Sequence, residues 1–333
     1  MGRDNKLLRA LTDKAKRNPK RVVFAEGANF KVLKAAQTVL QEGIAQPILL
    51  GNPEYIEKLI KENELDLGNV PIINWRGIEE RTRREEYAKI LFQKRSRKGL
   101  TYSEALDKMT DRNYFGAMMV ETGEADAFIS GSTSKYADTI RPAIQTVGIK
   151  AEINHIAGMY LVMTNKGPVF FSDTTVNPRP EAKTLVDTTL LTAEAVRKFN
   201  IEPVIAMVSY SNFGSIRTGS PVRVQEAVRI LHRDYPELIV DGDIQMNFAL
   251  NSELRTKMFP FSKLGNRKVN TIIFPNLSSG NIAYKMMQEL VGAEVIGPIL
   301  LGMKKSIHII PLESSVREIV NMVTIAVVDA QKK

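Results

Sequence analysis

In the stretch ADAFISGSTSKYADTIRPAIQ, residues 125–145, the spacing of the apolar residues changes from that of a strand to that of a helix. ADAFIS has the apolar residues of a buried strand, whereas YADTIRPAIQ has the spacing of a helix. A short run of Gly131 and hydroxyl residues separates them. Strand, small-residue loop and helix form the repeating unit of α/β proteins, whose ligands bind beyond the carboxyl ends of the strands. The stretch therefore predicts one such unit, with a candidate binding loop at its turn.

The same alternation of short apolar runs and helical patterns extends outward in both directions. It predicts a parallel sheet covered by helices on both faces. One helical stretch is unusually long and runs from Glu79 through Thr122. After His155, two apolar runs joined by an Asn-Lys-Gly turn predict an antiparallel hairpin. The expected strands are residues 21–25, 46–51, 70–75, 125–130, 156–164, 169–173, 204–210, 238–242 and 270–275, and the expected later helices are residues 180–199, 221–233 and 315–331.

Length and composition narrow the class of protein. A chain of 333 residues exceeds the size of a single growing core, so we expect two domains around a cleft. No apolar run is long enough for a membrane span, and no signal peptide is visible. We therefore expect a cytoplasmic protein that does not bind a membrane. The absence of cysteine excludes disulfides, thiolate nucleophiles and thiolate metal sites.

The basic charge balance has two interpretations. The net charge of +9 fits either nucleic acid or a polyphosphate ligand. Glu85 and Glu86 interrupt the basic run at residues 81–98, where Tyr87 and Leu91 have the spacing of one helix face. This pattern is typical of a solvated amphipathic helix, so we expect no nucleic-acid partner.

Two loops are candidate anion sites, because small residues admit a phosphate and hydroxyl or guanidinium groups donate to it. The first precedes the helix that carries Arg141. The second is SYSNFGSIRTGSPVR, residues 209–223, where Ser220 is a candidate cap before Pro221. Turns without a ligand remain the alternative for both loops. The candidate ligand-binding residues are Ser130, Gly131, Ser132 and Thr133 in the first loop and Ser209, Ser211, Gly214 and Ser215 in the second.

Other site patterns are missing or weak. The chain has no GxGxxG after a strand, no GxxxxGK[ST] and no HExxH. Asp241 and Asp243 in the DGD run suggest a turn with a helix cap more than magnesium, so no metal site is expected. The three histidines lie in or beside apolar runs and have no convincing catalytic partner: His155, His232 and His308.

Six separated blocks resemble the phosphate acetyl/butyryltransferase family: ADAFISGSTSKYADTIRPAIQ, FSDTTVNPRP, VSYSNFGS, DGDIQMNFAL, FPNLSSGNIAYK and GAEVIGPILLGM. The resemblance implies acyl transfer between coenzyme A and inorganic phosphate. It also implies two three-layer α/β/α domains of the isocitrate/isopropylmalate dehydrogenase-like architecture, residues 1–149 with 304–333 and residues 150–303. The implied partners are acyl-CoA, phosphate and further copies of the chain in a homodimer or larger homo-oligomer.

The resemblance also implies roles for individual residues. Arg95 and Arg141 match arginines that orient phosphate and offset charge, and Glu318 matches the carboxylate that takes the thiol proton. The block FPNLSSGNIAYK adds four expected ligand contacts, at Gly280, Asn281, Tyr284 and Lys285.

The chain departs from the family pattern near its C-terminal end. Where active members have Ser-Arg, aligned back from Ile319 and Val320, this chain has Pro311-Leu312. Neither side chain can replace a hydroxyl or a guanidinium. Asn247 also replaces an acidic residue. Losing one oxyanion donor removes about 3–4 kcal/mol of transition-state stabilisation. The catalytic candidates Arg95, Arg141 and Glu318 are therefore expected to be vestigial, unless Ser314, Ser315 or Arg317 replaces the missing groups.

The ends of the chain are similar to the C-terminal region of hybrid NADP-dependent malic enzymes. This similarity implies an excised regulatory domain that binds acetyl-CoA or a related acyl-CoA with little turnover and requires no cofactor itself. NADP and a divalent metal would belong to an N-terminal malic half, which is not visible in this sequence. An active phosphate acetyl/butyryltransferase is the alternative. A dehydrogenase or a pyridoxal-phosphate biosynthesis enzyme of related architecture is less supported, because its metal-binding carboxylates are not recognisable.

Overall fold

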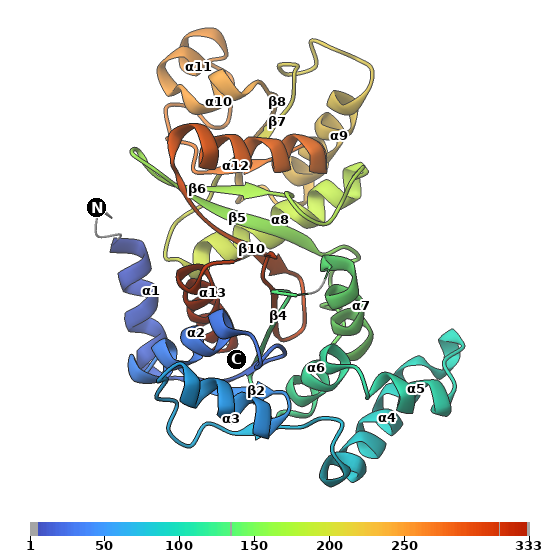
Figure 1. The fold of residues 1–333 in the computed structure, drawn as a ribbon. Coiled ribbons are helices and arrows are strands. Elements are labelled where there is room, and N and C mark those ends of the chain that lie inside the picture. Colours follow the sequence, from blue (N-terminus) through green and yellow to red (C-terminus); the bar gives the residue numbers. More distant parts are fainter. Residues whose placement is uncertain (1–5, 134, 313, 332–333) are drawn as a thin grey trace. The chain divides into compact units, whose positions relative to one another are not determined.

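The computed structural model describes residues 6–133, 135–312 and 314–331, and its chain divides into two compact units. The first unit comprises residues 1–149 and 303–333, and the second comprises residues 150–302. Each unit is built around its own sheet (Figure 1). The expected α/β class is confirmed, with one wholly parallel sheet and one mixed sheet.

The first unit holds a parallel sheet with strand order β11-β4-β1-β2-β3. Its strands are β1 (Lys20–Phe24), β2 (Ala45–Leu50), β3 (Ile72–Ile73), β4 (Ala127–Ser130) and β11 (Ser306–Ile309). Its α-helices are α1 (Lys6–Arg17), α2 (Phe30–Gln41), α3 (Pro53–Glu62), α4 (Arg81–Arg95), α5 (Tyr102–Lys108), α6 (Arg112–Thr122), α7 (Tyr136–Thr146) and α13 (Val316–Ala330). Figure 1 shows β4 between α13 on one side and α7 on the other, as expected for helices covering both faces of the sheet.

The second unit holds a sheet of order β10-β5-β6-β9-β7-β8, in which β5 and β6 form the predicted antiparallel hairpin. Its strands are β5 (Ala157–Thr164), β6 (Gly167–Ser172), β7 (Val204–Val208), β8 (Ile239–Ile244), β9 (Thr271–Ile273) and β10 (Glu294–Leu301). Its α-helices are α8 (Ala182–Lys198), α9 (Ser220–Asp234), α10 (Met246–Leu250), α11 (Ser252–Met258) and α12 (Leu277–Val291).

Alternation along β7 explains how this second sheet is buried on both faces. Ala206 and Val208 belong to one apolar cluster with Tyr284 of α12, whereas Ile205 and Met207 belong to another with α8 and α9. Successive side chains of a strand point to opposite faces, so a continuous apolar run places a core on each side.

The long helical stretch predicted from Glu79 to Thr122 is wrong. The structure divides it into α4, α5 and α6 with two short 3-10 turns, at Ile78–Glu80 and Ser96–Lys98. Gly99 has a left-handed φ of 87°, Thr101 starts α5 with a capping box, and Asp111 caps α6 through the amides of residues 113 and 114. The apolar pattern continued across these breaks, but the capping residues determine where each helix starts.

Two smaller expectations also need correction. Ser220 is the first residue of α9 and not its cap, since Gly219 occupies the cap position with a φ of 74°. The strand expected at residues 70–75 is limited to Ile72–Ile73. By contrast, Ser315 caps α13 as predicted, and the four expected core positions of that helix are buried: Ile319, Val323, Ile325 and Val327.

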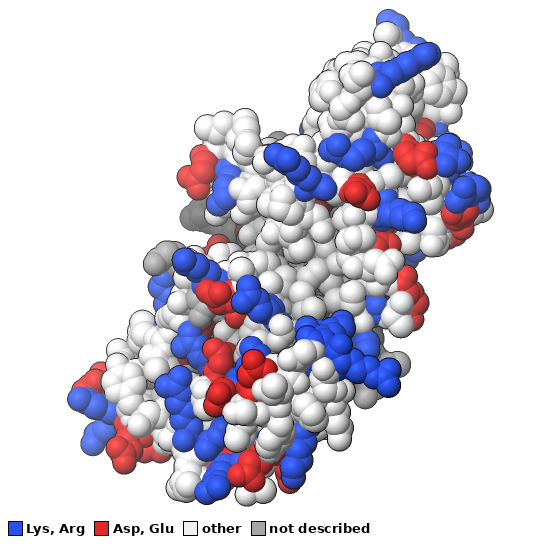
Figure 2. Space-filling view, turned by 90° about the vertical axis from the view of Figure 1, so that its right-hand side faces the viewer, with Lys and Arg blue, Asp and Glu red and all other residues white. Residues whose placement is uncertain are grey.

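Two surface properties follow from the described residues. No helix within them is long and apolar enough to cross a membrane. Figure 2 shows basic and acidic side chains mixed over the face that it displays. The basic excess of the sequence is therefore interspersed with acids on that face, as on an ordinary solvated surface.

Candidate functional site

Three loops meet at the carboxyl edge of the parallel sheet in the first unit. They follow β1, β4 and β11, which are neighbours in that order of pairing. The loops after β4 and β11 are in close contact, because a Cβ added to Gly131 would lie 2.2 Å from the carbonyl oxygen of Ile310. The sheet extends from β1 through β2 to one side and through β4 to the other, so this point is a topological switch, where open α/β sheets bind ligands.

The loop after β4 surrounds a carboxylate supplied by the chain itself. Glu26 follows β1 and is only 5% exposed. Its Oε2 accepts hydrogen bonds from the amides of Gly131 at 3.1 Å and Ser132 at 2.9 Å and from the Ser132 hydroxyl at 2.6 Å. Its Oε1 accepts from the Thr133 amide at 2.9 Å and the Thr133 hydroxyl at 2.8 Å. The expected phosphate cradle is thus an anion cradle that already contains Glu26.

Ser130 also has a structural partner. Its side chain is fully buried and donates to Oδ1 of Asn113 at 2.7 Å. This bond joins the end of β4 to the first turn of α6. The sequence correctly singled out this loop as rich in donors, but it did not reveal which acceptor the donors meet.

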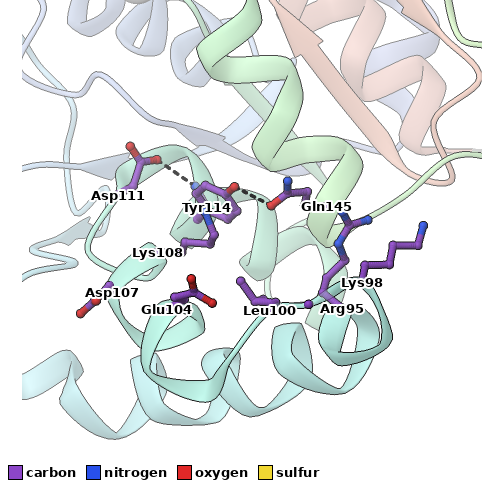
Figure 3. Close-up of a pocket in the computed structure, with 10 residues that line it drawn as sticks. Arg95, Lys98, Leu100, Glu104, Asp107, Lys108, Asp111, Tyr114 and Gln145 are labelled. Atoms are coloured by element: carbon purple, nitrogen blue, oxygen red, sulfur yellow. Dashed lines mark hydrogen bonds between the residues drawn. The ribbon is translucent and has the colours of Figure 1, made fainter.

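Arg95 lines a polar pocket, and Arg141 lies on the helix that supplies Gln145 to the same pocket. Arg95 ends α4 and lines a pocket of about 620 Å³, together with Gln145 of α7. Arg141 lies four residues before Gln145 on α7, hence on the same face of that helix. Figure 3 shows Arg95 and Lys98 beside Gln145, on one side of the pocket. The structure therefore places the arginine expected on α4 close to the helix face that carries the other arginine.

The remaining wall of the pocket carries both signs of charge. Its other lining residues are Lys98, Gly99, Leu100, Glu104, Asp107, Lys108, Asp111 and Tyr114. Hydrogen bonds from the Thr101 amide and hydroxyl lower the pKa of Glu104, whose carboxylate closes the capping box of α5. The ammonium of Lys108 lies 4.9 Å from the centre of the Tyr114 ring. Because Glu104 and Asp111 act as helix caps, the cations are the groups best suited to a ligand anion.

Tyr114 fixes the wall that α7 contributes. Its hydroxyl donates to Oε1 of Gln145 at 2.7 Å (Figure 3). We expect Tyr114→Phe to keep the ring and its contact with Lys108 but to lower the free energy of unfolding by about 1 kcal/mol, the typical net worth of a hydrogen bond. Urea denaturation measures this change. Tyr55→Phe is the matched control, because Tyr55 is 53% exposed on α3, and a loss at Tyr114 no larger than at Tyr55 would contradict the assignment.

Glu318 has a structural role in the first turn of α13. Its Oε2 accepts from the Ser315 amide at 2.7 Å and the Ser315 hydroxyl at 2.9 Å, while its own amide donates to that hydroxyl. The hydroxyl of Ser314 donates to the carbonyl of Pro311 at 2.9 Å. Leu312 is 55% exposed. The two serines that were candidates to replace the missing Ser-Arg therefore shape the loop after β11, and Arg317 is an exposed residue of α13.

The second candidate loop, in the second unit, is also built on a carboxylate. Asp243 is fully buried and accepts from the Gly214 amide at 2.9 Å. Ser211 and Ser215 pair through their hydroxyl oxygens at 3.0 Å. The Ser209 hydroxyl is buried and has no hydrogen-bond partner among the described residues. Among Ser209, Ser211 and Ser215, Ser209 is thus the one whose hydroxyl makes no hydrogen bond within the described residues.

The four residues expected to bind ligand from α12 have mixed positions. Tyr284 is 6% exposed and stacks on Tyr160 with ring centres 4.0 Å apart, so its ring is packed in the core of the second unit. Gly280 is buried, and a Cβ there would lie 2.6 Å from the carbonyl oxygen of Asp173, so the two backbones approach closely. The Asn281 side chain donates to the carbonyl of Thr174 at 3.4 Å. Lys285 is exposed and lies over the Tyr284 ring.

The DGD run and the histidines can also be placed. Asp241 accepts from the Ser262 hydroxyl and the Lys263 amide, and both aspartates lie within β8, not in the expected turn. His155 contacts Asp187 at 2.8 Å, whereas His308 is 1% exposed beside α13. No group of three or more potential metal ligands occurs within the described parts of the chain.

Sequence reasoning missed Glu26, Tyr114 and Gln145. Glu26 lies in FAEG directly after a predicted strand, so a signal was present. Its importance required the pairing of β1 with β4, which a single sequence does not provide. Tyr114 and Gln145 are separated by 31 positions, and only the packing of α6 against α7 brings them together.

Comparison with known proteins decides the family. Residues 6–327 match the family described as phosphate acetyl/butaryl transferase. The chain belongs to this family. It is 32% identical to a phosphate acetyltransferase of Clostridium acetobutylicum, over 98% of this chain and 99% of that protein. The family resemblance of the separated sequence blocks is therefore confirmed.

Two further relatives of this phosphate acetyl/butaryl transferase family member are informative. An NADP-dependent malic enzyme of Escherichia coli is 34% identical over 98% of this chain but only 43% of its own length. The solved structure of a phosphotransacetylase from Streptococcus pyogenes has a TM-score of 0.90 and 32% identity, covering 97% of this chain and 98% of that one. The chain thus spans nearly all of two transferase relatives and less than half of the malic enzyme.

Proposed function

We propose that this protein transfers an acyl group, acetyl or butyryl, between coenzyme A and inorganic phosphate. The observation that carries this proposal is the polar pocket lined by Arg95 and Gln145, with Arg141 one helical turn before Gln145 on the same face of α7. The guanidinium of Arg95 at the pocket and that of Arg141 on the adjoining helix face can together hold the oxygens of a phosphate. A relative of nearly equal length that is named phosphate acetyltransferase supports the same reaction.

The proposed reaction needs orientation and charge stabilisation. The thiolate sulfur of coenzyme A attacks the carbonyl carbon of the acyl phosphate and forms the thioester bond. The bond from that carbon to the phosphate oxygen breaks, and phosphate leaves as the inorganic anion. Arg95 and Arg141 hold the phosphoryl oxygens and offset the charge that develops on the tetrahedral intermediate.

Glu318 is the proposed acceptor of the thiol proton. Because its Oε2 accepts both bonds of the capping box, the proposal assigns the proton to Oε1. Acyl-CoA and phosphate are then the only ligands required, without a metal or a further cofactor. A homodimer or larger homo-oligomer is part of the same proposal.

An acyl-CoA-binding regulatory domain of a malic enzyme is the second candidate. Pro311 and Leu312 favour it, because both are exposed on the loop after β11 and neither can donate a hydrogen bond from its side chain. In this case the pocket would bind acetyl-CoA with little turnover. NADP and a divalent metal would be held by a malic domain outside these residues.

One coupled experiment separates the two candidates. Acetyl-CoA is titrated calorimetrically into the protein, and acetyl phosphate formation from acetyl-CoA and phosphate is assayed on the same preparation. Binding with turnover, lost in Arg141→Ala, supports the transferase. Binding without turnover rejects the transferase in favour of the regulatory domain, and absence of both excludes both candidates.

A further inference from the structure

Glu26 is the group at the sheet edge to which the proposed reaction gives no role. The Glu26 cradle consists of the amides of Gly131, Ser132 and Thr133 and the hydroxyls of Ser132 and Thr133. Its five donors come from a segment more than 100 residues away from Glu26 in the sequence. A contact of this kind links two separate loops, whereas a local turn would close only on itself.

The two carboxylate oxygens share the donors almost evenly. Oε2 takes the two groups of Ser132 and the Gly131 amide, and Oε1 takes the two groups of Thr133. Nη2 of Arg112 lies 3.3 Å from Oε1 and donates to the Thr133 hydroxyl at 2.7 Å. The described residues that contact the oxygens of this buried carboxylate through hydrogen bonds do so as donors, and Arg112 is a cation. These surroundings suit a carboxylate, which only accepts hydrogen bonds, and do not suit an amide, whose NH2 group would face other donors.

The cradle also occupies the position where a ligand would be expected. The sheet continues from β1 to β2 on one side of this point and from β4 to β11 on the other. Helix α7 begins just beyond the loop after β4. Because these donors already make hydrogen bonds to Glu26, a phosphate group cannot accept from them at the same time. Two anions this close would also repel each other. The ligand phosphate must therefore be held by other cations of this unit, such as Arg95 and Arg141.

We propose that Glu26 is a built-in anion that holds the loop at residues 131–133 and thereby positions Arg141 on α7. The opposite end of α7 is fixed independently. Nζ of Lys94 donates to the carbonyl of Thr146 at 2.7 Å, and Tyr114 donates to Gln145. Glu26 anchors the start of the helix and these two bonds anchor its end, so the helix face that carries Arg141 is held from both sides.

The test exploits the space that Glu26 leaves when it is removed. Glu26→Ala opens a cavity lined by donors, which a small carboxylate such as formate can fill. We expect this variant to melt at a lower temperature than the wild type and formate to restore part of the loss. Wild-type protein should show no such response to formate. Failure of formate to raise the melting temperature of Glu26→Ala would overturn the anion cradle.

Glu26→Gln is the matched control. Its amide has nearly the shape of the carboxylate, but one oxygen becomes an NH2 group that faces hydrogen-bond donors. We expect no formate response, because the space is filled, and amide hydrogen exchange at residues 131–133 faster by at least about tenfold. The amides of residues 213 and 214, at Asp243, should exchange as in the wild type and serve as an internal reference. Unchanged exchange at 131–133 would contradict the cradle even if Glu26→Ala failed to fold.

The positioning of Arg141 rests on the proposed function and is read separately. Turnover and calorimetric coenzyme A affinity are measured for Glu26→Ala with and without formate. A shift of about 1 Å in a catalytic group costs about 10²-fold, so we expect a fall in kcat of this order that formate partly reverses. Formate rescue of melting without any change in turnover would disprove positioning. Wild-type protein without turnover or binding would reject the transferase and the positioning role together, while melting and exchange still decide the cradle.

Discussion

Arg141→Ala is expected to lower kcat/KM for acetyl transfer by about 10²–10³-fold, the loss typical of removing one preorganised charge-stabilising donor. Arg141 lies on the face of α7 that contributes Gln145 to the pocket of Arg95. Its guanidinium is proposed to contact the phosphoryl oxygens in the ground state and the developing charge in the transition state. Both KM for phosphate and kcat should therefore change, as measured by steady-state kinetics in the direction of acetyl phosphate formation.

Arg81→Ala is the control for Arg141. Arg81 is also an exposed helical arginine, but it pairs with Glu85 at the opposite end of α4 from Arg95. The kcat/KM of Arg81→Ala should stay within about twofold of the wild-type value, because exposed ion pairs contribute little to stability. Equal effects of the two substitutions would show that Arg141 acts only through overall charge. Full activity of Arg141→Ala would remove it from the proposed site.

Arg255→Leu is expected to lower the free energy of unfolding of the second unit by at least about 3 kcal/mol, because each unsatisfied buried acceptor costs about 1–3 kcal/mol. Arg255 on α11 is completely buried. Its guanidinium donates to the carbonyls of Ala249 at 2.6 Å, Arg267 at 2.5 Å, and Phe248 and Gly265 at 3.1 Å. Burial lowers the pKa of this guanidinium, while the charge of Asp241 opposes that shift. An arginine nevertheless remains charged.

The carbonyls held by Arg255 belong to segments on both sides of α11, so the side chain ties this part of the unit together. Urea unfolding followed by circular dichroism measures the loss. Arg229→Ala is the control, because Arg229 pairs with Glu226 on the surface of α9 and its loss should leave the stability nearly unchanged. Arg255→Lys should recover little, since a single ammonium cannot span all four carbonyls. Stability of Arg255→Leu equal to that of Arg229→Ala would contradict this role.

Much of the fold was predictable because its patterns are local. The hairpin of β5 and β6 follows from two apolar runs and a short turn, and α13 follows from Ser315 and its apolar face. The breaks between α4, α5 and α6 were not predicted, because their capping residues lie within a continuous apolar pattern. Strands β10 and β11 were not predicted either, since each completes a sheet with partners far away in the sequence.

The site was predictable only in part, for a related reason. Small residues and hydroxyls in residues 130–133 indicate a loop of donors, and in the structure these donors bind the side chain of Glu26. That the anion is Glu26 depends on the pairing of β1 with β4. The burial of Tyr284 was missed because a tyrosine in a conspicuous block looks the same in sequence whether it packs in a core or faces a ligand.

The first unit is built from two separate segments of the chain, and this has a consequence for the order of folding. Its parallel sheet ends in β11, and α13 packs on that sheet, yet both come after the whole of residues 150–302. During synthesis the ribosome delivers the complete second unit before it delivers the segment that finishes the first. The edge of β4 that pairs with β11 has no partner until β11 has been synthesised. We therefore expect the sheet of the first unit to be completed only after residues 150–302 have been made.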